Sequence, residues 1–171
     1  MNGTLHFMEH QELDEPSLQQ LAQLLISVVE DGASIGFLPP LSAEEALEYW
    51  RGATQPGVLL WTAWKGEKLC GTVQLQLCTK ANGRHRAEVA KLMVHPAERN
   101  QGIARALMSR LEARAEQEQR RLLVLDTRTG DPSNQLYLSL GYQVVGTIPG
   151  YALSASGDKD ATTIYYKELH V

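Results

Sequence analysis

Hydrophobic and polar residues recur along this chain with two different periods, and each period predicts a different kind of element. After Pro16 the apolar residues recur every three or four positions until Asp31, which predicts a helix with one buried stripe. From Val58 the period changes to two. The segments VLLWTAWK, LCGTVQLQLCTK and RAEVAKLMVHP, separated by the turns KGEK and ANGR, predict an antiparallel meander of three strands. The helical period returns from Gly102 to about Glu118.

The remaining segments predict shorter elements, each bounded by residues typical of caps and turns. These are a strand over Thr4 to Glu9, a helix from the capping box of Ser42 and Glu45 through Trp50, a central strand over RLLVLDT (121–127), a helix from Pro132 to Leu140 closed by Gly141, and two final strands, YQVVGTI and ATTIYYKEL. Two stretches fit neither period and predict loops, GASIGFLPPL and PGYALSASGDKD (149–160).

The order of these elements predicts a mixed α/β fold with a βαβ crossover around RNQGIARAL. We expect one domain over residues 1–171, because the chain has about one domain's length, ordinary hydrophobic content, and neither repeats nor a clear linker.

Charge narrows the classes of partner. The chain has 16 basic and 20 acidic residues and a net charge of -4, so it lacks the basic footprint of a nucleic-acid binder. The beginning of the chain shows no signal-peptide pattern, and no apolar run is long enough to cross a bilayer. We therefore expect a cytoplasmic protein with a small-molecule partner and no membrane partner. The sequence leaves open whether it forms a homodimer.

Cysteine and histidine residues do not predict a metal site or a disulfide. Cys70 and Cys78 fall in one predicted strand, about 26 Å apart if it is extended, which is beyond the reach of a disulfide. The five histidines show no HxxxH spacing. We expect both cysteines to be packing residues.

The segment RNQGIARAL places Arg99, Gly102, Ala104 and Arg105 at the predicted start of a helix. A helix start presents unpaired backbone N–H groups and the positive end of the helix dipole, which together attract an anion. Gly102 and Ala104 leave the approach open, and the arginines add positive charge. The alternative is that Gly102 only relieves a tight strand-to-helix connection and that the arginines are solvated.

The arrangement KLMVHPAERNQGIARALM resembles the acetyl-CoA-binding motif of the GNAT superfamily of N-acetyltransferases, in which Arg99, Gly102 and Ala104 fill the three signature positions. The element order and the later LGY at 140–142 agree with this resemblance. More narrowly, DGASIGF, RAEVAKLMV, LLVLDT and the closing segment are similar to the tabtoxin resistance members of the superfamily, which acetylate an amino acid toxin. The resemblance implies the GNAT fold, a seven-stranded mixed sheet flanked by about four helices.

The resemblance also implies acetyl-CoA as cosubstrate, without a metal. The backbone amides of residues 101–105 would hold its pyrophosphate, next to Arg99 and Asn100, and Asn134 would bond the pantetheine arm. The backbone of residues 92–94 would pair with the arm, and a bulge near Met93 or Val94 would leave an N–H free to polarise the thioester carbonyl. The residues expected to bind the cosubstrate are Leu92, Met93, Val94, Arg99, Asn100, Gln101, Gly102, Ile103, Ala104, Arg105, Asn134 and Tyr137.

Acyl transfer to an amine requires a proton acceptor for the ammonium. Glu88 is a candidate base inside the strand RAEVAKLMV, where alternation predicts Glu88, Ala90 and Leu92 on one face and Val89, Lys91 and Met93 on the other. The alternative for Glu88 is an ion pair with Lys91 or Arg86, or a surface position. Asp126, at the end of the next strand, could share this role or bind the ammonium; it could also cap the following turn.

Tyr137 is the candidate general acid, since the family often has a tyrosine at this position and a phenol can protonate a departing thiolate. It also fits the apolar stripe with Leu136 and Leu140, so the alternative is a core aromatic. For the acceptor we expect a pocket made by Ser34, Ile35, Gly36 and Phe37, with Tyr151 and the loop 149–160 closing over it.

These observations favour an enzyme that acetylates a small amine or amino acid-like compound, a toxin or antibiotic among them. Two other functions stay open at this point. One is acetylation of a protein N-terminus or lysine, which an open groove would favour. The other is a CoA-binding sensor without turnover, which the loss of Glu88 and Tyr137 would have favoured.

Overall fold

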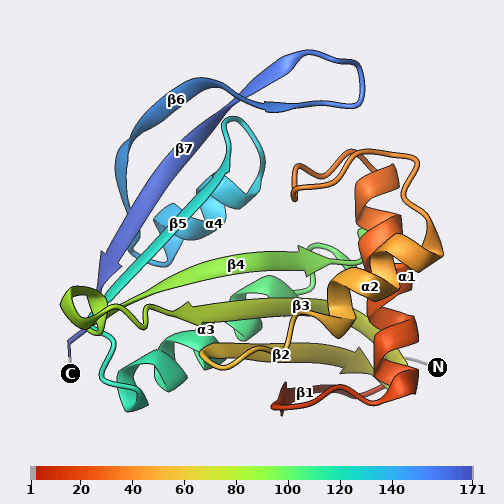
Figure 1. Ribbon diagram of the computed structural model, residues 1–171, viewed down its shortest axis with the longest axis horizontal. Coiled ribbons are helices and arrows are strands. Elements are labelled where there is room, and N and C mark those ends of the chain that lie inside the picture. Colours follow the sequence, from red (N-terminus) through yellow and green to blue (C-terminus); the bar gives the residue numbers. More distant parts are fainter. Residues whose placement is uncertain (1–2, 171) are drawn as a thin grey trace.

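A computed structural model describes residues 3–170 of the chain and contains one seven-stranded mixed sheet with four α-helices (Figure 1). The strand order across the sheet is β1-β2-β3-β4-β5-β7-β6. The elements are β1 (Leu5–His10), α1 (Glu15–Glu30), α2 (Ala43–Arg51), β2 (Val58–Lys65), β3 (Lys68–Leu77), β4 (Arg86–Val94), α3 (Ile103–Gln117), β5 (Leu122–Arg128), α4 (Ser133–Ser139), β6 (Gln143–Leu153) and β7 (Lys159–Glu168). This confirms the predicted fold class.

Helices α1 and α2 cover one face of the antiparallel half of the sheet. The side chain of Asp14 caps α1, and Ser42 and Glu45 form the predicted capping box of α2. The buried stripe of α1 packs against α2 and against the β2 and β3 side chains on this face, and Trp50 is fully buried between them. Each cap side chain accepts a hydrogen bond from one amide of the first helical turn, Ser17 N in α1 and Glu45 N in α2, so both helices begin at a defined residue beside the sheet.

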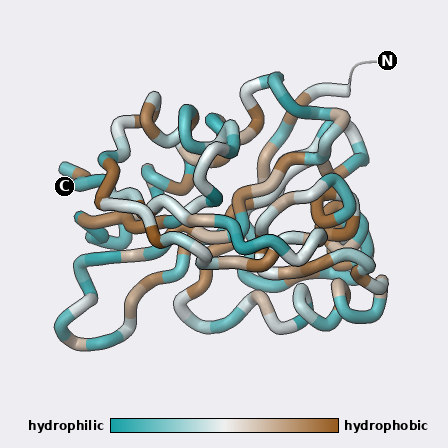
Figure 2. The backbone as a smooth tube through the Cα atoms, turned by 90° about the horizontal axis from the view of Figure 1, so that it is seen from above, coloured by the Kyte–Doolittle hydropathy of each residue, from teal (hydrophilic) through white to brown (hydrophobic). Residues whose placement is uncertain are grey.

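Helix α3 covers the opposite face. Its residues Ile103, Leu107 and Leu111 are at most 2% exposed and lie in one core with side chains of β3, β4 and β5. Figure 2 shows hydrophobic stretches on the strands in the middle of the molecule and hydrophilic ones on the outer loops. Cys70 lies in this core with its thiol donating to Ala63 O, and both cysteines are free. The expectation of unpaired cysteines is confirmed.

The sheet opens between β4 and β5. These two strands are parallel neighbours, but only three residue pairs join them, from Arg86 with Leu122 to Glu88 with Val124. Beyond that point the strands diverge, and β5 continues beside β7 and β6 (Figure 1). The edge of β4 after Glu88 therefore has no strand partner on the β5 side.

The segment predicted as a loop at 149–160 is mostly a β-hairpin. Strand β6 continues to Leu153 and β7 begins at Lys159, with a shift of register between Ile148 and Ala152. Pro149 and Gly150 suggested a turn, but they lie at this irregularity, where residues unfit for regular pairing are tolerated. The tight turn lies at 154–158 instead, where Ser154 N donates to Asp158 O. The loop prediction was therefore wrong for both ends of this segment.

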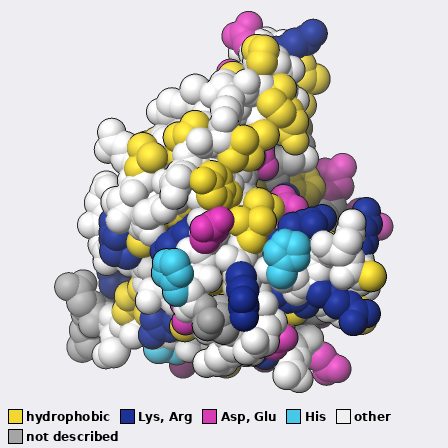
Figure 3. Space-filling model, turned by 90° about the vertical axis from the view of Figure 1, so that its left-hand side faces the viewer, with side chains coloured by type: hydrophobic (Ala, Val, Ile, Leu, Met, Phe, Trp, Pro, Cys, Tyr) yellow, Lys and Arg dark blue, Asp and Glu magenta, His cyan; other side chains and the backbone are white. Residues whose placement is uncertain are grey.

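The hairpin of β6 and β7 projects beyond the two cores. No residue of β6 belongs to either core, and Val145, Tyr151 and Leu153 are more than half exposed. Figure 3 shows hydrophobic side chains gathered along this projecting part of the surface. No helix within residues 3–170 is long and apolar enough to cross a membrane.

Candidate active site

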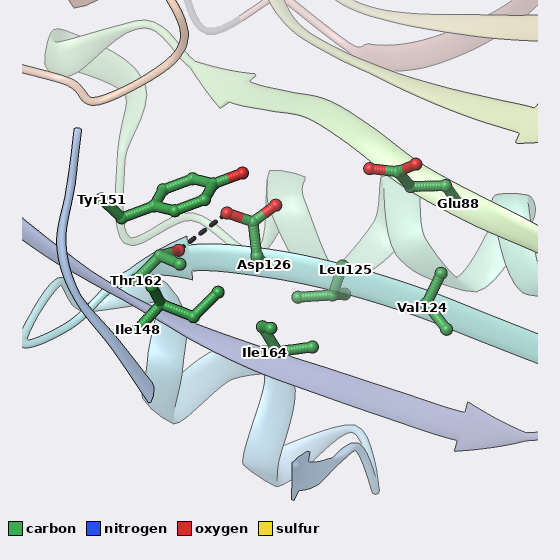
Figure 4. Close-up of a pocket in the computed structure, with 8 residues that line it drawn as sticks. All are labelled: Glu88, Val124, Leu125, Asp126, Ile148, Tyr151, Thr162 and Ile164. Atoms are coloured by element: carbon green, nitrogen blue, oxygen red, sulfur yellow. Dashed lines mark hydrogen bonds between the residues drawn. The ribbon is translucent and has the colours of Figure 1, made fainter. Parts of the chain in front are cut away.

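Two carboxylates lie beside the opening of the sheet. The last residue pair that joins β4 to β5 is Glu88 with Val124. Asp126 lies two residues after Val124 in β5, so its side chain is on the same face of the strand as that of Val124. Figure 4 shows both side chains pointing into the space between the two strands. With Tyr151, Ile148 and Ile164 from the hairpin, they line a hollow of about 180 Å³.

The two carboxylates have different surroundings. Burial raises the pKa of the Glu88 carboxyl above its usual range, the negative charge of Asp126 raises it further, and Lys91 opposes both effects. Asp126 accepts a 2.7 Å hydrogen bond from the hydroxyl of Thr162 on β7, which orients its side chain. The raised pKa of Glu88 suits a proton acceptor, and the Thr162 hydroxyl fixes the direction of the Asp126 side chain.

A bulge in β4 changes which side chains share a face. Thr72 pairs with Met93 but Gln74 pairs with Ala90, so Lys91 and Leu92 both lie opposite the single residue Val73. Lys91 has a φ of 55°, in the left-handed region. Such a bulge inserts one residue and inverts the alternation that follows it.

The predicted alternation was therefore wrong beyond Ala90. Leu92 packs against the α3 core together with Val89, whereas Met93 is buried in the core of α1 and α2. Lys91, predicted on the face opposite Glu88, is close enough to Glu88 and Asp126 to affect the pKa of Glu88. The bulge near Met93 that the family resemblance implied is present, centred two positions earlier.

Lys91 extends from the bulge toward the loop between α1 and α2. Its ammonium lies 5.7 Å from the centre of the Tyr49 ring and close to Gly36, where an added Cβ would be 3.5 Å from Nζ. Burial lowers the pKa of the Lys91 ammonium, while the charges of Asp126 and Glu88 oppose that shift. No carboxylate among residues 3–170 lies within 4 Å of this nitrogen.

Tyr137 is a buried residue of α4. It is 5% exposed and lies edge-on to Tyr142, with ring centres 5.6 Å apart. Burial raises the pKa of the Tyr137 phenol, and the charge of Asp126 raises it further. The hydroxyl is therefore protonated at any ordinary pH. The structure thus shows the core position, and Tyr137 does not line the hollow beside the sheet opening, so its role at the site stays a prediction.

The start of α3 presents backbone amides that have no hydrogen-bond partner within residues 3–170. The helical hydrogen bonds of α3 begin at Ala106, whose amide donates to Gly102 O at 3.0 Å. The amides of residues 103–105 lie before this first bond. Gly102 has a φ of 76°, and a Cβ there would meet no atom within 4 Å. The backbone at this helix start is therefore exposed, as the anion-binding prediction requires.

The two arginines at this helix start are held by weak surface contacts. Arg99 forms an ion pair with Asp31 at 2.7 Å, and both side chains are nearly half exposed. Arg105 donates to the hydroxyl of Ser139 at 2.7 Å. Exposed pairs contribute about 0–1 kcal/mol, so either guanidinium can exchange its partner for an anion.

Asn134 already has partners within the protein. Its Nδ2 donates to the carbonyls of Arg128 and Asp131, and its Oδ1 accepts from the hydroxyl of Tyr165 at 2.7 Å. These bonds hold the turn between β5 and α4 in place. Binding of the pantetheine arm by Asn134 stays a prediction, as do the roles of the other residues expected to contact the cosubstrate.

The residues predicted to bind the acceptor divide between two hollows. Glu88, Asp126 and Tyr151 line the hollow beside the sheet opening, whereas Ser34 and Phe37 line a second hollow, facing Leu153 and Ser154 of the hairpin. Ile35 lies between them in sequence and packs on the core of α1 and α2. The structure thus does not bring all six residues together in one pocket.

Sequence reasoning missed Thr162 and assigned Lys91 no role at the site beyond an ion pair. Thr162 alternates regularly in β7, and only the pairing of β5 with β7 brings its hydroxyl to Asp126. In β4, strict alternation would place Lys91 on the face opposite Glu88. A lysine flanked by apolar residues in a central strand was a usable signal, since such a charge is rarely buried without a reason.

The sheet thus opens beside two carboxylates, and a helix of the same sheet begins with exposed amides. The chain belongs to the acetyltransferase (GNAT) family, whose model matches residues 18–142. It is therefore an acetyltransferase. The narrower resemblance to tabtoxin resistance members stays a prediction.

Solved structures agree on the fold. An acetyltransferase of the GNAT family from Streptococcus pneumoniae is 18% identical, with a TM-score of 0.80 over 97% of this chain and 100% of that one. The structure of yncA from Salmonella typhimurium with its cofactor acetyl-CoA is 19% identical, with a TM-score of 0.78 over 96% and 94%. A ribosomal-protein-alanine N-acetyltransferase from Brucella melitensis is 20% identical, with a TM-score of 0.80 over 95% and 99%.

Proposed function

We propose that this enzyme transfers the acetyl group of acetyl-CoA to the amine of a small amino acid-like compound, a toxin or antibiotic among them. The observation that carries the proposal is the position of Glu88 and Asp126 together beside the unpaired edge of β4. That edge and the start of α3 suit an extended, anionic cosubstrate, and the carboxylates suit a cationic amine.

The residues present fit acetyl-CoA. The amides of residues 103–105 have no partners in the part of the chain that the structure describes, and the absence of a side chain at Gly102 leaves the approach open to a pyrophosphate. The backbone of β4 from Leu92 to Val94 has no strand partner on the β5 side, so it can pair with an amide-containing arm. The bound thioester supplies an electrophilic carbonyl carbon and a thiolate leaving group.

Glu88 and Asp126 prepare the acceptor. The acceptor arrives as an ammonium, which is attracted to the two negative charges. Glu88 takes a proton from it, directly or through water, and burial favours this because it raises the pKa of the carboxyl. The free amine forms its bond to the carbonyl carbon as the carbon–sulfur bond breaks. The acylated nitrogen then gives up its second proton to solvent, and the first proton leaves Glu88 for solvent as well.

Tyr137 acts on the departing sulfur. Burial makes its hydroxyl a weaker acid than a free phenol, because it raises the pKa. A free thiol has a pKa of about 8.5, so complete transfer of the proton from Tyr137 is uphill. We therefore assign Tyr137 donation of a hydrogen bond to the developing thiolate, with solvent supplying the final proton.

The hollow favours a small acceptor. Its volume of about 180 Å³ is below the ~300–1,000 Å³ of sites for drug-sized ligands. Tyr151 from the hairpin stands at its border, as Figure 4 shows, and narrows it on the side away from Glu88. A polypeptide acceptor needs a longer groove than this hollow provides.

The test combines binding and turnover with the full chain. We expect calorimetry to detect binding of acetyl-CoA, and a thiol-release assay to detect turnover with small amines or amino acids. Turnover with short peptides alone would indicate a protein acetyltransferase, and binding without any turnover would indicate a sensor. Absence of acetyl-CoA binding by the folded protein would contradict the proposal.

A further inference from the structure

Lys91 reaches from the bulge of β4 to the loop between α1 and α2. Its ammonium lies beside the Tyr49 ring and near Gly36, in the loop whose residues Ser34 and Phe37 line the second hollow. Lys91 itself lines neither hollow, but Glu88, three positions earlier in β4, lines the first one. The bulge of β4 produces this position, because it turns Lys91 to the face that carries Glu88.

Other cations near this region already have carboxylate partners. Arg128, which lines the second hollow, bonds Asp131 at 3.0 Å and lies 3.5 Å from Asp160. Arg99 is paired with Asp31. Lys91 differs from both, since no acidic oxygen within the described part of the chain lies within 4 Å of Nζ.

The surroundings of Lys91 leave its charge incompletely compensated. The Tyr49 ring lies on one side and is itself fixed by a 3.0 Å hydrogen bond between its hydroxyl and Gln74. Burial costs an ammonium part of its hydration, and an anion at hydrogen-bond distance restores more of that free energy than a ring or a distant carboxylate. Gly36 has no side chain to cover the Lys91 ammonium. Its φ of 93° is a backbone conformation that favours glycine at this position.

We propose that Lys91 binds the carboxylate of the acceptor, so that the preferred acceptors are amino acids with the amine and the carboxylate in one small molecule. The ammonium of such an acceptor lies toward Glu88 and Asp126, and its carboxylate lies toward Lys91. Opposite charges at the two ends fix the direction in which the acceptor enters. This inference rests on the proposed function and names the residue that selects the substrate class.

The test compares acceptors that differ only in the carboxylate. The pairs are phenylalanine with phenethylamine, tyrosine with tyramine, and lysine with cadaverine. We expect the wild-type enzyme to use at least one amino acid with a higher kcat/KM than its decarboxylated partner. Lys91→Met keeps the length of the side chain and tolerates the backbone conformation about as well as lysine.

In Lys91→Met, kcat/KM for the amino acid should fall by about tenfold to a hundredfold, the range for a lost hydrogen bond between charged groups, mostly through KM. For the decarboxylated amine, measured above the acidic limb of the pH profile, it should change by less than about threefold. Lys91→Arg should restore part of the preference. Lys80→Met, which removes one positive charge from an exposed loop, should leave both acceptors unaffected.

The outcomes separate the inference from the function on which it rests. If no acceptor of any pair is acetylated by the wild-type enzyme, the proposed function fails for this substrate class. If Lys91→Met lowers kcat/KM equally for both members of each pair, Lys91 does not recognise the carboxylate and acts only through its charge on Glu88. That result overturns the inference. A wild-type preference for the decarboxylated amines overturns it as well.

Discussion

Glu88 on β4 and Asp126 on β5 face the same opening where these two strands separate, and the charge of Asp126 adds to burial in raising the pKa of Glu88. The relationship depends on the sheet itself. If β4 and β5 stayed paired to their ends, a ladder of hydrogen bonds would fill the space into which both carboxylates point (Figure 4). Because the strands diverge after Glu88 and Val124, two negative charges share one hollow, and one of them holds its proton more tightly than an isolated glutamate.

The pH dependence of activity should follow this relationship. Glu88 accepts a proton only when it is ionised, so kcat/KM should fall as the pH falls through its raised pKa. Asp126→Asn removes the charge that raises the pKa, so the acidic limb of the pH profile should move to lower pH. Lys91→Met removes the opposing charge and should move the limb to higher pH. Profiles of kcat/KM against pH check both directions.

Asp158→Asn in the turn of the hairpin is the matched control, because it removes an exposed aspartate away from Glu88. It should leave the limb in place. Glu88→Gln should lower kcat by about 10²–10⁴-fold, the range for loss of a general base, without weakening the binding of acetyl-CoA. If Glu88→Gln kept the kcat of the wild-type enzyme, the general base would have to be another residue.

Replacement of Gly102 should weaken acetyl-CoA binding. Gly102→Ala places a Cβ at a φ of 76°, which destabilises the helix start by about 1–2 kcal/mol and crowds the exposed amides. Gly157→Ala is the control, since Gly157 has a φ of 86° and equally open surroundings but lies in the hairpin turn. Both variants should lose similar stability in thermal unfolding. Calorimetry should show a raised Kd for Gly102→Ala only, and equal Kd values would contradict the proposed pyrophosphate site.

The hydroxyl of Tyr137 should matter for turnover and little for binding. Tyr137→Phe should lower kcat by roughly tenfold to a hundredfold through loss of the hydrogen bond to the thiolate, with the Kd of acetyl-CoA unchanged. Because the pKa of Tyr137 is raised, no alkaline limb from its ionisation should appear in the wild-type profile below about pH 10. Steady-state kinetics and calorimetry measure these quantities.

Tyr142→Phe is the matched control for Tyr137→Phe. Tyr142 packs against Tyr137, and its buried hydroxyl faces the carboxylate of Glu112. Removing a buried hydroxyl beside a charged group costs about 1–3 kcal/mol, so stability should fall by that amount while kcat should stay the same. Equal effects of the two substitutions would show that Tyr137 acts through core packing alone.

Local patterns predicted most of the elements well. The period of two over 58–65 predicts β2 with its observed bounds, and the capping box of Ser42 and Glu45 begins α2 where expected. The glycine before α3 has the positive φ that a bare backbone at a helix start requires. These features depend on interactions between residues a few positions apart, so the chain carries the information locally.

The sequence by itself thus determined the elements of this acetyltransferase, the helix start that suits an anion, and the identity of Glu88, Asp126 and Tyr137 as candidates. Only the tertiary structure decided which of them meet. The bulge at Lys91 inverts a face, the pairing of β6 with β7 turns an expected loop into a hairpin, and the divergence of β4 from β5 opens the site. Each depends on which strands pair and in what register, and these contacts join residues far apart in the chain, beyond the reach of any local period.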